Sequence, residues 1–388
     1  MNLLSVAARN VLRNKFRTTL TIVGGAVAVL AFVLLRTVVD AWYVGVDNAA
    51  RDRLATRHKV SITMTMPKRY IDTVREVPGI RAATYANWFG AKDPRDPDNF
   101  FANMAIDAPS ALVVFDEMVL TPEDKQRWLD DKAGCILGDV LARRLKVKVG
   151  DPITLRGTIY PGDWTFNVSG IYTAARKSVD RSQFFFHWDY LNERVSQGRR
   201  DQIGWISSRV DDPRRSAEIS AAIDRIFDEK DNQTATMSER AMNNSFMATF
   251  SAILTAMDIV SVIILLIMMM ILGNTIAMGV RERTTEYGVL RAIGFSPGHL
   301  RAFVIGEALT TGVLTGLLGL AISYPIIQIG FGRFLEENMG AWFPYFRISP
   351  TTAIAGVLLA VLLAVVASLL PAYRAGKLTV TDALRRVA

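Results

Sequence analysis

The stretch IVSVIILLIMMMILGNTIAMGV, residues Ile259–Val280, contains no charged side chain. About 20 apolar residues in an α-helix cross the roughly 30 Å hydrocarbon core of a bilayer, so this stretch predicts a membrane-spanning helix. Two further uncharged apolar runs are Thr18–Leu35 and Thr351–Leu370. A fourth run, Ala302–Phe331, is long enough to span, although it holds one Glu and one Pro. The sequence therefore predicts four spans.

The overall composition agrees with a membrane protein. Half of the 388 residues are hydrophobic and the mean hydropathy is +0.22, which is too apolar for an ordinary soluble chain of this length. The first span follows a basic stretch, so a cleaved signal peptide is an alternative interpretation. Its apolar core is longer than the usual length of about 7–15 residues, and no small-x-small cleavage site follows it. We therefore expect an uncleaved anchor.

The charged residues are distributed unevenly along the chain. From Asp40 to Thr249, 30 Lys and Arg residues are balanced by 30 Asp and Glu residues, so the net charge of +8 comes from the short segments beside the spans. Lys and Arg beside spans tend to stay in the cytoplasm. We therefore expect both termini and residues 281–301 to be cytoplasmic and residues 41–245 to be extracytoplasmic. Because the basic residues are split among these segments, the charge does not indicate a nucleic-acid partner.

Residues 41–245 alternate strand-like and helix-like patterns. HKVSITMTM (His58–Met66) alternates with the period of a strand. TPEDKQRWLDD begins as helices do, with Thr121 as a cap and Pro122 at the first helical position, and residues 212–229 have amphipathic helical spacing. This mixture predicts an α+β domain, which we expect to comprise two subdomains with a boundary near residues 130–135. The single Cys cannot form an internal disulfide, so the domain depends on its core.

No motif in the chain indicates catalysis or metal binding. Neither G-x-S-x-G nor H-E-x-x-H occurs, and the acid-rich KDPRDPDN lacks the spacing of an EF-hand. His58, His187 and His299 are isolated, without a Cys or carboxylate at ligand spacing, so we expect structural or surface roles for them. The Phe-rich QFFFHWDY is typical of a buried strand. We therefore expect no metal, cofactor or catalytic residue in this chain.

Arg36 and Asp258 are ionisable residues near the ends of the first two spans. With a rise of 1.5 Å per residue, Arg36 lies roughly 27 Å above Thr18, and Asp258 roughly 33 Å above Val280. Charges deep in a bilayer are costly, and long side chains reach toward the interface. We expect both residues at similar heights near the outer interface, where they either pair or reach the interface separately.

Glu307 lies only about 8 Å above the cytoplasmic end of the third span. It needs a cationic or hydrated neighbour, and Arg301 and Arg374 are the nearest cations in height. Pro325 is expected to kink or end this helix. The same span has small residues at a spacing that lets another helix approach closely, either from this chain or from a second copy: Ala308, Gly312 and Gly316, with Gly319 beside them.

The segment RERTTEYGVLRAIGFSPGHLR, Arg281–Arg301, carries a recognisable signature. It resembles the pattern R-t-x-E-(I/Y)-G-(V/I)-L-R-A-(I/L)-G of the MacB/FtsX-type ABC transporter permeases, which include LolC/LolE-like and MacB-like members. The matching residues are Arg283, Glu286, Tyr287, Gly288, Val289, Leu290, Arg291, Ala292, Ile293 and Gly294.

Further segments extend the resemblance over nearly the whole chain. The tail PAYRAGKLTVTDALR is similar to the family pattern P-A-x-x-A-x-x-x-P-x-x-A-L-R and departs from it at Val380, where Pro is common. ARNVLRNKFRTTLTIVG resembles the family's N-terminal amphipathic helix and first span. GDVLARRLKVKVGDPITL is similar to a segment of its extracytoplasmic domain. The matching residues of the tail are Pro371, Ala372, Ala375, Ala383, Leu384 and Arg385.

The resemblance implies a non-enzymatic permease subunit of the bacterial inner membrane that works with a separate ATPase. It implies a complex of two permeases, identical or paired, with two ATPase subunits that carry ATP and Mg²⁺. A periplasmic adaptor or carrier is a further candidate partner. The chain itself contains no G-x-x-x-x-G-K-[ST] loop. ATP-driven movement would be relayed to the outer domain, a process called mechanotransmission, to extract or export a lipoprotein, lipid, peptide or drug.

An alternative is an FtsX-like regulator that activates a cell-wall hydrolase or signalling partner and transports nothing. The large outer domain favours transport, since the cell-wall regulators typically have a much smaller one.

The resemblance implies that residues 281–301 form a short coupling helix that contacts the ATPase. Tyr287, Leu290 and Ile293 recur at three-residue spacing and predict an apolar stripe. Thr284 is the expected cap and Gly294 the expected end of the helix. The alternative is an amphipathic helix that lies on the bilayer surface. The residues assigned to ATPase coupling are Arg283, Glu286, Tyr287, Gly288, Leu290, Arg291, Ile293 and Gly294.

Together these expectations divide the chain into nine segments. They are an N-terminal amphipathic helix (1–17), the first span (18–40), the extracytoplasmic domain (41–245), a stalk with the second span (246–280), the coupling segment (281–301), the third span (302–331), an outer loop (332–350), the fourth span (351–372) and a cytoplasmic tail (373–388).

Overall fold

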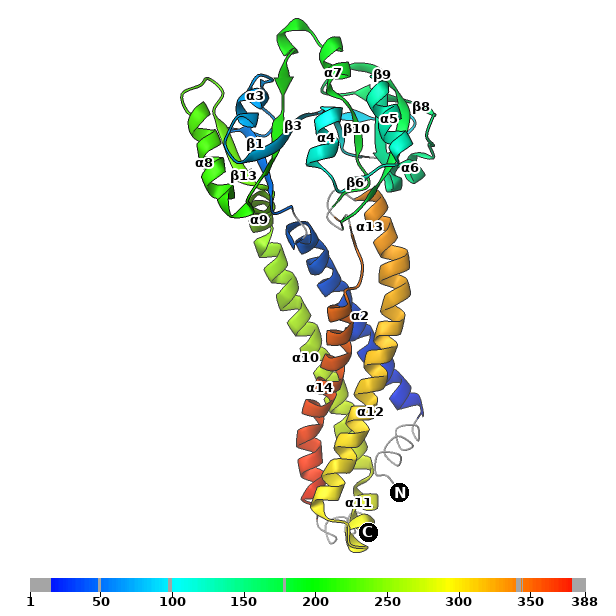
Figure 1. Cartoon of the computed structure of the whole chain (residues 1–388). Helices are drawn as coiled ribbons and strands as arrows, with labels where there is room; N and C mark the ends of the chain where they lie inside the picture. The colour runs from blue at the N-terminus through cyan, green and yellow to red at the C-terminus, as the bar shows by residue number, and fades with distance from the viewer. Residues whose placement is uncertain are drawn as a thin grey trace. The chain divides into compact units, whose positions relative to one another are not determined.

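The computed structural model describes residues 15–47, 50–96, 100–176, 179–339, 343 and 345–378 (Figure 1). The chain forms two compact units. One comprises residues 1–40, 251–332 and 347–388 and holds most of the apolar helices; the other comprises residues 41–250 and 333–346 and holds the sheets. The N-terminal amphipathic helix expected over 1–17 and the end of the tail, 379–388, lie mostly or wholly outside the described residues.

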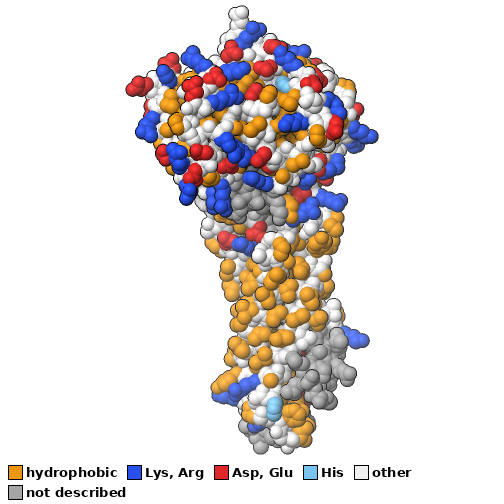
Figure 2. All heavy atoms as spheres, in the orientation of Figure 1, with side chains coloured by type: hydrophobic (Ala, Val, Ile, Leu, Met, Phe, Trp, Pro, Cys, Tyr) orange, Lys and Arg blue, Asp and Glu red, His pale blue; other side chains and the backbone are white. Residues whose placement is uncertain are grey.

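Four helices among the described residues are long and apolar enough to cross a membrane: Lys15–Tyr43, Ser251–Glu282, Pro297–Asn338 and Pro350–Gly376. They correspond to α2 (Lys15–Asp47), α10 (Ser251–Glu282), α12 (Pro297–Ser323) with its continuation, and α14 (Pro350–Gly376). Hydrophobic side chains cover the surface of these helices in Figure 2, as contact with lipid requires. The predicted architecture of four spans with a domain inserted between the first and second is confirmed.

The third and fourth spans begin at hydroxyl caps followed by proline. Ser296 accepts a hydrogen bond from the amide of His299, and Pro297 occupies the first turn of α12. Ser349 accepts one from the amide of Thr352 and precedes α14. These caps satisfy amides that helix ends leave unpaired, and proline there loses nothing because its position needs no donor. The third helix therefore begins at residue 297 instead of 302.

The third span also continues beyond its expected end at Phe331. Tyr324–Phe331 form a π-helical segment, η3, and Gly332–Asn338 form α13, so residues 332–338 are helical and not a loop. Pro325 lacks an amide hydrogen, and its ring would clash with the preceding turn of an α-helix. A wider π turn accommodates both effects, so Pro325 alters this helix without ending it.

Small residues let α12 approach α14 closely, as their spacing predicts. A Cβ atom added to Gly312 would lie 2.9 Å from the Cβ of Ala364, and one added to Gly316 would lie 3.0 Å from the Cα of Val357. Gly319 makes a similar approach to α2. These contacts lie within one chain, so the small-residue face is already occupied by neighbouring spans.

The outer domain is built on a mixed sheet of eleven strands among its described residues, with the order β13-β1-β12-β3-β5-β10-β7-β9-β8-β4 and β6 beside β9; β11 and β2 pair separately. The strands are β1 (Arg53–His58), β2 (Met66–Pro67), β3 (Ile80–Trp88), β4 (Ala91–Lys92), β5 (Asn103–Ile106), β6 (Met118–Val119), β7 (Gly134–Gly138), β8 (Pro152–Gly157), β9 (Gly162–Ala174), β10 (Phe184–His187), β11 (Gln202–Ile203), β12 (Trp205–Val210) and β13 (Thr234–Ser238).

Short helices connect these strands. They are α3 (Tyr70–Arg75), α4 (Ala108–Val114), α5 (Pro122–Asp130), α6 (Asp139–Leu145), α7 (Trp188–Arg194), α8 (Ser216–Phe227) and α9 (Glu239–Thr249), with 3-10 turns η1 (Gln197–Arg199) and η2 (Pro213–Arg215). The hydroxyl of Thr121 accepts a hydrogen bond from the amide of Asp124 and caps α5 as expected. The expected boundary near residues 130–135 does not divide the sheet, because β5 and β10 pair across it.

The centre of the sheet is apolar on both faces. Phe184 and Phe186 of β10 are fully buried, and Phe185 on the opposite face is buried as well. β5 and β7 pair with the two edges of β10, and its faces are covered by two apolar clusters, one with Phe184 and Phe186 and the other with Phe185. The prediction of a buried strand at QFFFHWDY is confirmed.

The strand expected over His58–Met66 is wrong in most of its length. β1 ends at His58, whose Nδ1 accepts a hydrogen bond from the amide of Val60, and residues 59–65 form turns. Val60 and Ile62 are exposed. Alternation of apolar and polar residues marks a strand only where another strand pairs with it, and β1 pairs with β12 and β13 upstream of this segment.

Adjacent glycines in α2 provide a matched test of span packing. A Cβ added to Gly25 would lie 2.5 Å from the Cγ2 of buried Thr315, whereas one added to Gly24 would meet nothing within 4 Å. We expect Gly25→Val to lower the free energy of unfolding in detergent by about 1–3 kcal/mol, because the added methyls overpack this contact. Gly24→Val should leave the thermal transition nearly unchanged. Equal effects of the two substitutions would contradict the close approach of α2 and α12.

Candidate functional site

The segment with the family-like signature forms α11 (Thr284–Ala292), which lies between the ends of α10 and α12 (Figure 1). Only Arg283 separates α11 from α10. The hydroxyl of Thr284 donates to the carbonyls of Arg281 and Val280, at 2.8 and 3.3 Å. The expected N-cap role of Thr284 is therefore wrong: it already belongs to the helix, and its hydroxyl satisfies the last carbonyls of α10 instead.

Gly294 ends α11, as expected. Its φ angle is +99°, a backbone conformation that favours glycine. The amide of Gly294 donates to the carbonyl of Arg291 at 3.1 Å, and the amide of Phe295 donates to that of Leu290 at 3.0 Å. This pair of bonds is the Schellman arrangement that closes a helix and turns the chain toward the next element.

One face of α11 packs against the ends of the spans. The side chain of Tyr287 is 2% exposed and contacts a buried cluster with Leu300 and Val304 of α12 and Ala372 of α14. Leu290 packs against the same cluster, and Gly288 is buried on this side. Burial raises the pKa of Tyr287 to about 12. Tyr287 therefore attaches α11 to its own chain, and half-buried Leu290 contributes to the same contact.

The opposite face of α11 is exposed and largely apolar. Val289 is 51% exposed and Ile293 68%, and Glu286 also lies on this side. The expected apolar stripe of Tyr287, Leu290 and Ile293 is thus wrong for Ile293, which lies on the exposed face. Each three-residue step in an α-helix falls about 60° short of a full turn, so Ile293 lies about 120° away from Tyr287 around the axis.

Arg283 and Glu307 form a partly buried ion pair beside this helix. The Nη1 of Arg283 lies 3.1 and 2.9 Å from the two carboxylate oxygens of Glu307. The partners expected from height alone, Arg301 and Arg374, are therefore wrong. Arg283 stands at the corner between α10 and α11, and its long side chain reaches along the span to the level of Glu307. Arg291, also of the signature, is partly buried and donates to the carbonyl of Phe295.

Polar contacts tie the first span to the second at both ends. At the end next to α11, the Nη1 of Arg17 lies 2.7 Å from the Oε1 of Glu282. At the outer end, the Nη1 of Arg36 lies 2.9 Å from the Oδ1 of Asp258. The pairing alternative for these two residues is confirmed. Because each pair contributes one residue from α2 and one from α10, both ends of the two helices are held together.

Asp40 extends the outer contact to the fourth span. The Nη2 of Arg36 lies 3.7 Å from one oxygen of Asp40. The other oxygen accepts hydrogen bonds from Ser349 at 3.0 Å and Thr352 at 2.7 Å. These hydroxyls belong to the cap and first turn of α14, so one chain of polar contacts connects α10, α2 and α14 near the outer interface.

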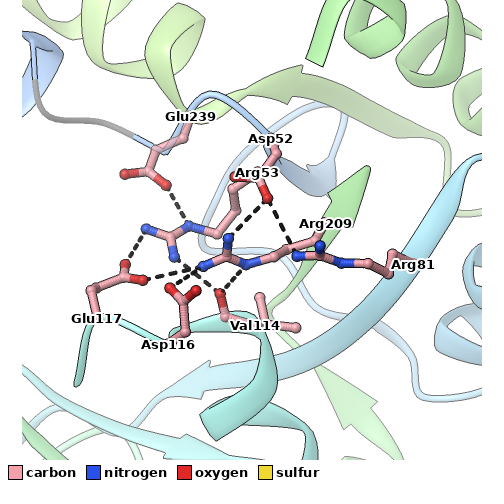
Figure 3. A network of polar contacts seen from close by, with 8 residues as sticks. All are labelled: Asp52, Arg53, Arg81, Val114, Asp116, Glu117, Arg209 and Glu239. Atoms are coloured by element: carbon pink, nitrogen blue, oxygen red, sulfur yellow. Dashed lines mark hydrogen bonds and ion pairs between the residues drawn. The ribbon is translucent and has the colours of Figure 1, made fainter. Parts of the chain in front are cut away.

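A second polar network lies inside the outer domain (Figure 3). Arg53, the first residue of β1, pairs with Glu117 and with Glu239, the first residue of α9. Its guanidinium also lies 4.6 Å from the ring centre of Phe115. Arg53 is almost fully buried, as is Glu117.

Arg209 of β12 forms the centre of the same network. It is 3% exposed and pairs with Asp52 at 2.9 Å, with Asp116 and with Glu117 at 3.3 Å. Its Nε also donates to the carbonyl of Val114 at 2.8 Å. Burial alone would raise the pKa of Asp116, but a hydrogen bond with Glu117 and the charge of Arg209 together hold that pKa below its usual range.

The network connects three separate parts of the domain. It joins the first strand after the first span, the first residue of the helix that precedes the second span, and the connection that follows α4. Sequence reasoning missed it because Arg53 and Arg209 are separated by more than 150 residues. Their only local signal is a charged residue within a strand that is otherwise buried.

The three His residues have structural contacts. His187 contacts the carbonyl of Trp128 at 2.7 Å, and burial lowers the pKa of His187. The imidazole of His299 accepts from the amide of Ser296 and completes the cap of α12. Within the described ranges, no group of three His, Cys, Asp or Glu residues could hold a metal ion.

Comparisons with known proteins agree with this architecture. Residues 18–226 match the family model of the MacB-like periplasmic core domain, and residues 259–380 match that of the FtsX-like permease C-terminal region. An uncharacterised ABC transporter permease of Methanocaldococcus jannaschii is 24% identical, over 99% of this chain and 98% of its own.

Two other relatives match over parts of their length. The macrolide export ATP-binding/permease protein MacB of Chromobacterium violaceum is 27% identical, over 61% of this chain and 34% of its own. The lipoprotein-releasing system transmembrane protein LolE of Haemophilus influenzae is 21% identical, over 55% of this chain and 52% of its own.

The outer ion pair is testable by a double-mutant cycle. We expect Arg36→Leu to lower the thermal transition in detergent, because it leaves Asp258 and Asp40 without their cation. Adding Asp258→Asn should recover part of the loss, with a coupling energy of about 1 kcal/mol. Strictly additive losses from the two single substitutions would show that the residues do not interact.

The network of the outer domain should be sensitive to the loss of one member. Arg209→Met removes one of the two cations that pair with buried Glu117, together with the ion pairs of Arg209 with Asp52 and Asp116, so we expect the domain to lose about 3 kcal/mol of unfolding free energy. Unfolding is followed by tryptophan fluorescence, since all but one of the Trp residues lie in residues 41–245. The control is Arg214→Met, whose arginine is exposed and pairs with nearby Asp212, and which should change stability by less than about 0.5 kcal/mol. A comparable loss in the control would rule out a special role for the network.

Proposed function

The chain belongs to the MacB/FtsX family of ABC transporter permeases, and from this premise we propose that it couples ATP hydrolysis on a separate ATPase subunit to movements of its extracytoplasmic domain. In this proposal the chain is a non-catalytic subunit that spans the bacterial inner membrane. Both of its termini and α11 lie in the cytoplasm, as the basic residues beside the spans favour.

The observation that carries the proposal is the two-sided character of α11. Its inner face is attached to α12 and α14 through Tyr287, and the Arg283–Glu307 pair fixes its start. Its outer face presents Val289 and Ile293 to a partner. Exposed apolar residues rimmed by charge are typical of a protein interface. A partner that moves this face must therefore move the ends of the spans as well.

Rigid, packed elements provide a route for such movement along the chain. α10 joins α11 through one residue at its cytoplasmic end, and only Phe250 separates it from α9 at its outer end. α9 begins at Glu239, which belongs to the buried network of the outer domain. The route thus consists of helices linked in sequence, with ion pairs at their ends.

The proposed assembly contains two permeases, identical or paired, and two ATPases. The printed names of relatives include macrolide export and lipoprotein release. We accordingly propose that the cargo is an envelope substrate, such as a lipoprotein, lipid, peptide or drug, that is extracted or exported through movements of the outer domain.

The exposed face of α11 is the place to test the proposal. We expect Val289→Asp with Ile293→Asp, and separately Glu286→Arg, to reduce copurification with the ATPase about tenfold, which corresponds to the loss of one interface hot spot of about 1.4 kcal/mol. ATP hydrolysis by the complex should lose its response to envelope substrate. Membrane insertion and the thermal transition of the permease should be unchanged.

Two further variants control this experiment. Val113→Asp introduces a charge at an exposed apolar residue of the outer domain and should not affect the ATPase. Tyr287→Asp places a charge in the buried cluster and should lower the stability of the permease itself. Full ATPase binding by the α11 variants would refute the assigned contact. Stimulation of ATP hydrolysis by a soluble hydrolase alone would favour the regulatory alternative.

A further inference from the structure

We propose that Arg301, Tyr373 and Lys377 form a binding site for the headgroup of an anionic phospholipid, in the leaflet that borders the α11 end of the spans. Arg301 lies in the second turn of α12, and the other two residues lie at the end of α14. The proposal depends on the chain spanning a bilayer, and it is independent of the ATPase contact at α11.

Two cations converge on one aromatic ring at this site. The guanidinium carbon of Arg301 lies 5.3 Å from the ring centre of Tyr373, and the Nζ of Lys377 lies 4.7 Å from it. Both distances are within the range of a cation–π contact. Two positive charges so close to one ring repel each other, and an anion shared between them would turn this repulsion into attraction.

The cations of this site have no carboxylate partner in the described part of the chain. No Asp or Glu oxygen there lies within 4 Å of the charged groups of Arg301 or Lys377. Arg17 and Arg283, at the same end of the spans, are instead paired with Glu282 and Glu307. Among the described residues, no carboxylate thus neutralises Arg301 or Lys377, unlike the neighbouring Arg17 and Arg283.

The side chain of Arg301 packs directly against a glycine of α14. The side chain of Arg301 crosses Gly376 so closely that a Cβ there would lie 2.6 Å from its Nε and 3.1 Å from its Cγ. Gly376 is in the last turn of α14 and has ordinary helical backbone. The absence of a side chain at residue 376 thus lets the Arg301 side chain lie against the end of α14, with its guanidinium beside Tyr373.

The surface beside the site identifies the anion as a lipid. Leu369, Leu370 and Tyr373 of α14 are all exposed and continue the apolar surface of the spans away from the cations. Figure 2 shows Lys and Arg side chains where the apolar surface of the helices ends. A phosphodiester with acyl chains can occupy both parts, and guanidinium groups bind phosphate oxygens in pairs. A soluble phosphate or an acidic peptide would use the cations alone.

The test uses the full chain purified in detergent and mixed with equal amounts of phosphatidylglycerol and phosphatidylcholine. Native mass spectrometry measures which lipid remains bound. We expect the chain to retain phosphatidylglycerol preferentially and Arg301→Gln with Lys377→Gln to reduce that preference about thirtyfold, since each of the two basic residues contributes on the order of 1 kcal/mol to attraction of an anionic lipid. Inorganic phosphate at millimolar concentration should not displace the lipid.

Two matched variants distinguish a specific lipid-binding site from a general attraction of anionic lipid by positive charge. Gly376→Ala keeps every charge but displaces Arg301, and we expect it to lose most of the preference. Lys15→Gln with Arg281→Gln removes two exposed positive charges from the same end of other spans and should retain it. The thermal transition in phosphatidylcholine alone checks that each variant is folded.

Three outcomes would overturn the proposal. They are an equal loss of preference in the control pair, an unchanged preference in folded Gly376→Ala, and displacement of the lipid by inorganic phosphate. Should the double Gln variant fail to fold, Gly376→Ala and Tyr373→Leu still decide the question, because neither removes a charge.

Discussion

The contact between Arg283 and Glu307 is the constraint on which the α11 end of the spans depends. A carboxylate in a span is costly unless a cation meets it, and here the cation comes from the corner between two helices. The pair therefore fixes where α10 ends, where α11 begins and how both lie against α12. The close packing of Tyr287 and the glycine turn at Gly294 complete a short helix that has only one face left for a partner.

Ion pairs also join separate elements elsewhere in the chain. Ion pairs hold α2 to α10 at both ends, and a buried network holds β1, β12 and α9 together in the outer domain. Between these points the helices are held by close approach at small residues. Such packing has little tolerance for added volume, because a Cβ at Gly312 or Gly316 would already meet α14 at less than ordinary contact distance.

The sequence was most informative where a single physical rule decides the outcome. Apolar length predicted the four spans, and helical rise placed Arg36 and Asp258 at heights where they do pair. Rules of this kind fail where a long side chain or a third element intervenes. Height alone assigned Glu307 to the wrong arginines, and residue spacing placed Ile293 on the wrong face of α11. The network around Arg209 needed the tertiary fold, because its partners come from distant strands.

The buried network of the outer domain also has a consequence for how this protein can change over generations. Removing one charge leaves its direct partners less compensated, whereas replacing the whole set by apolar residues of similar volume is often neutral or favourable in proteins. Substitution at any one of Arg53, Arg209, Glu117 and Glu239 is therefore expected to depend on the other three. Lineages can keep the network or lose it altogether, but intermediate sequences must pass through a weakened domain. Among relatives, these four positions should accordingly vary together, even though they are scattered along the chain.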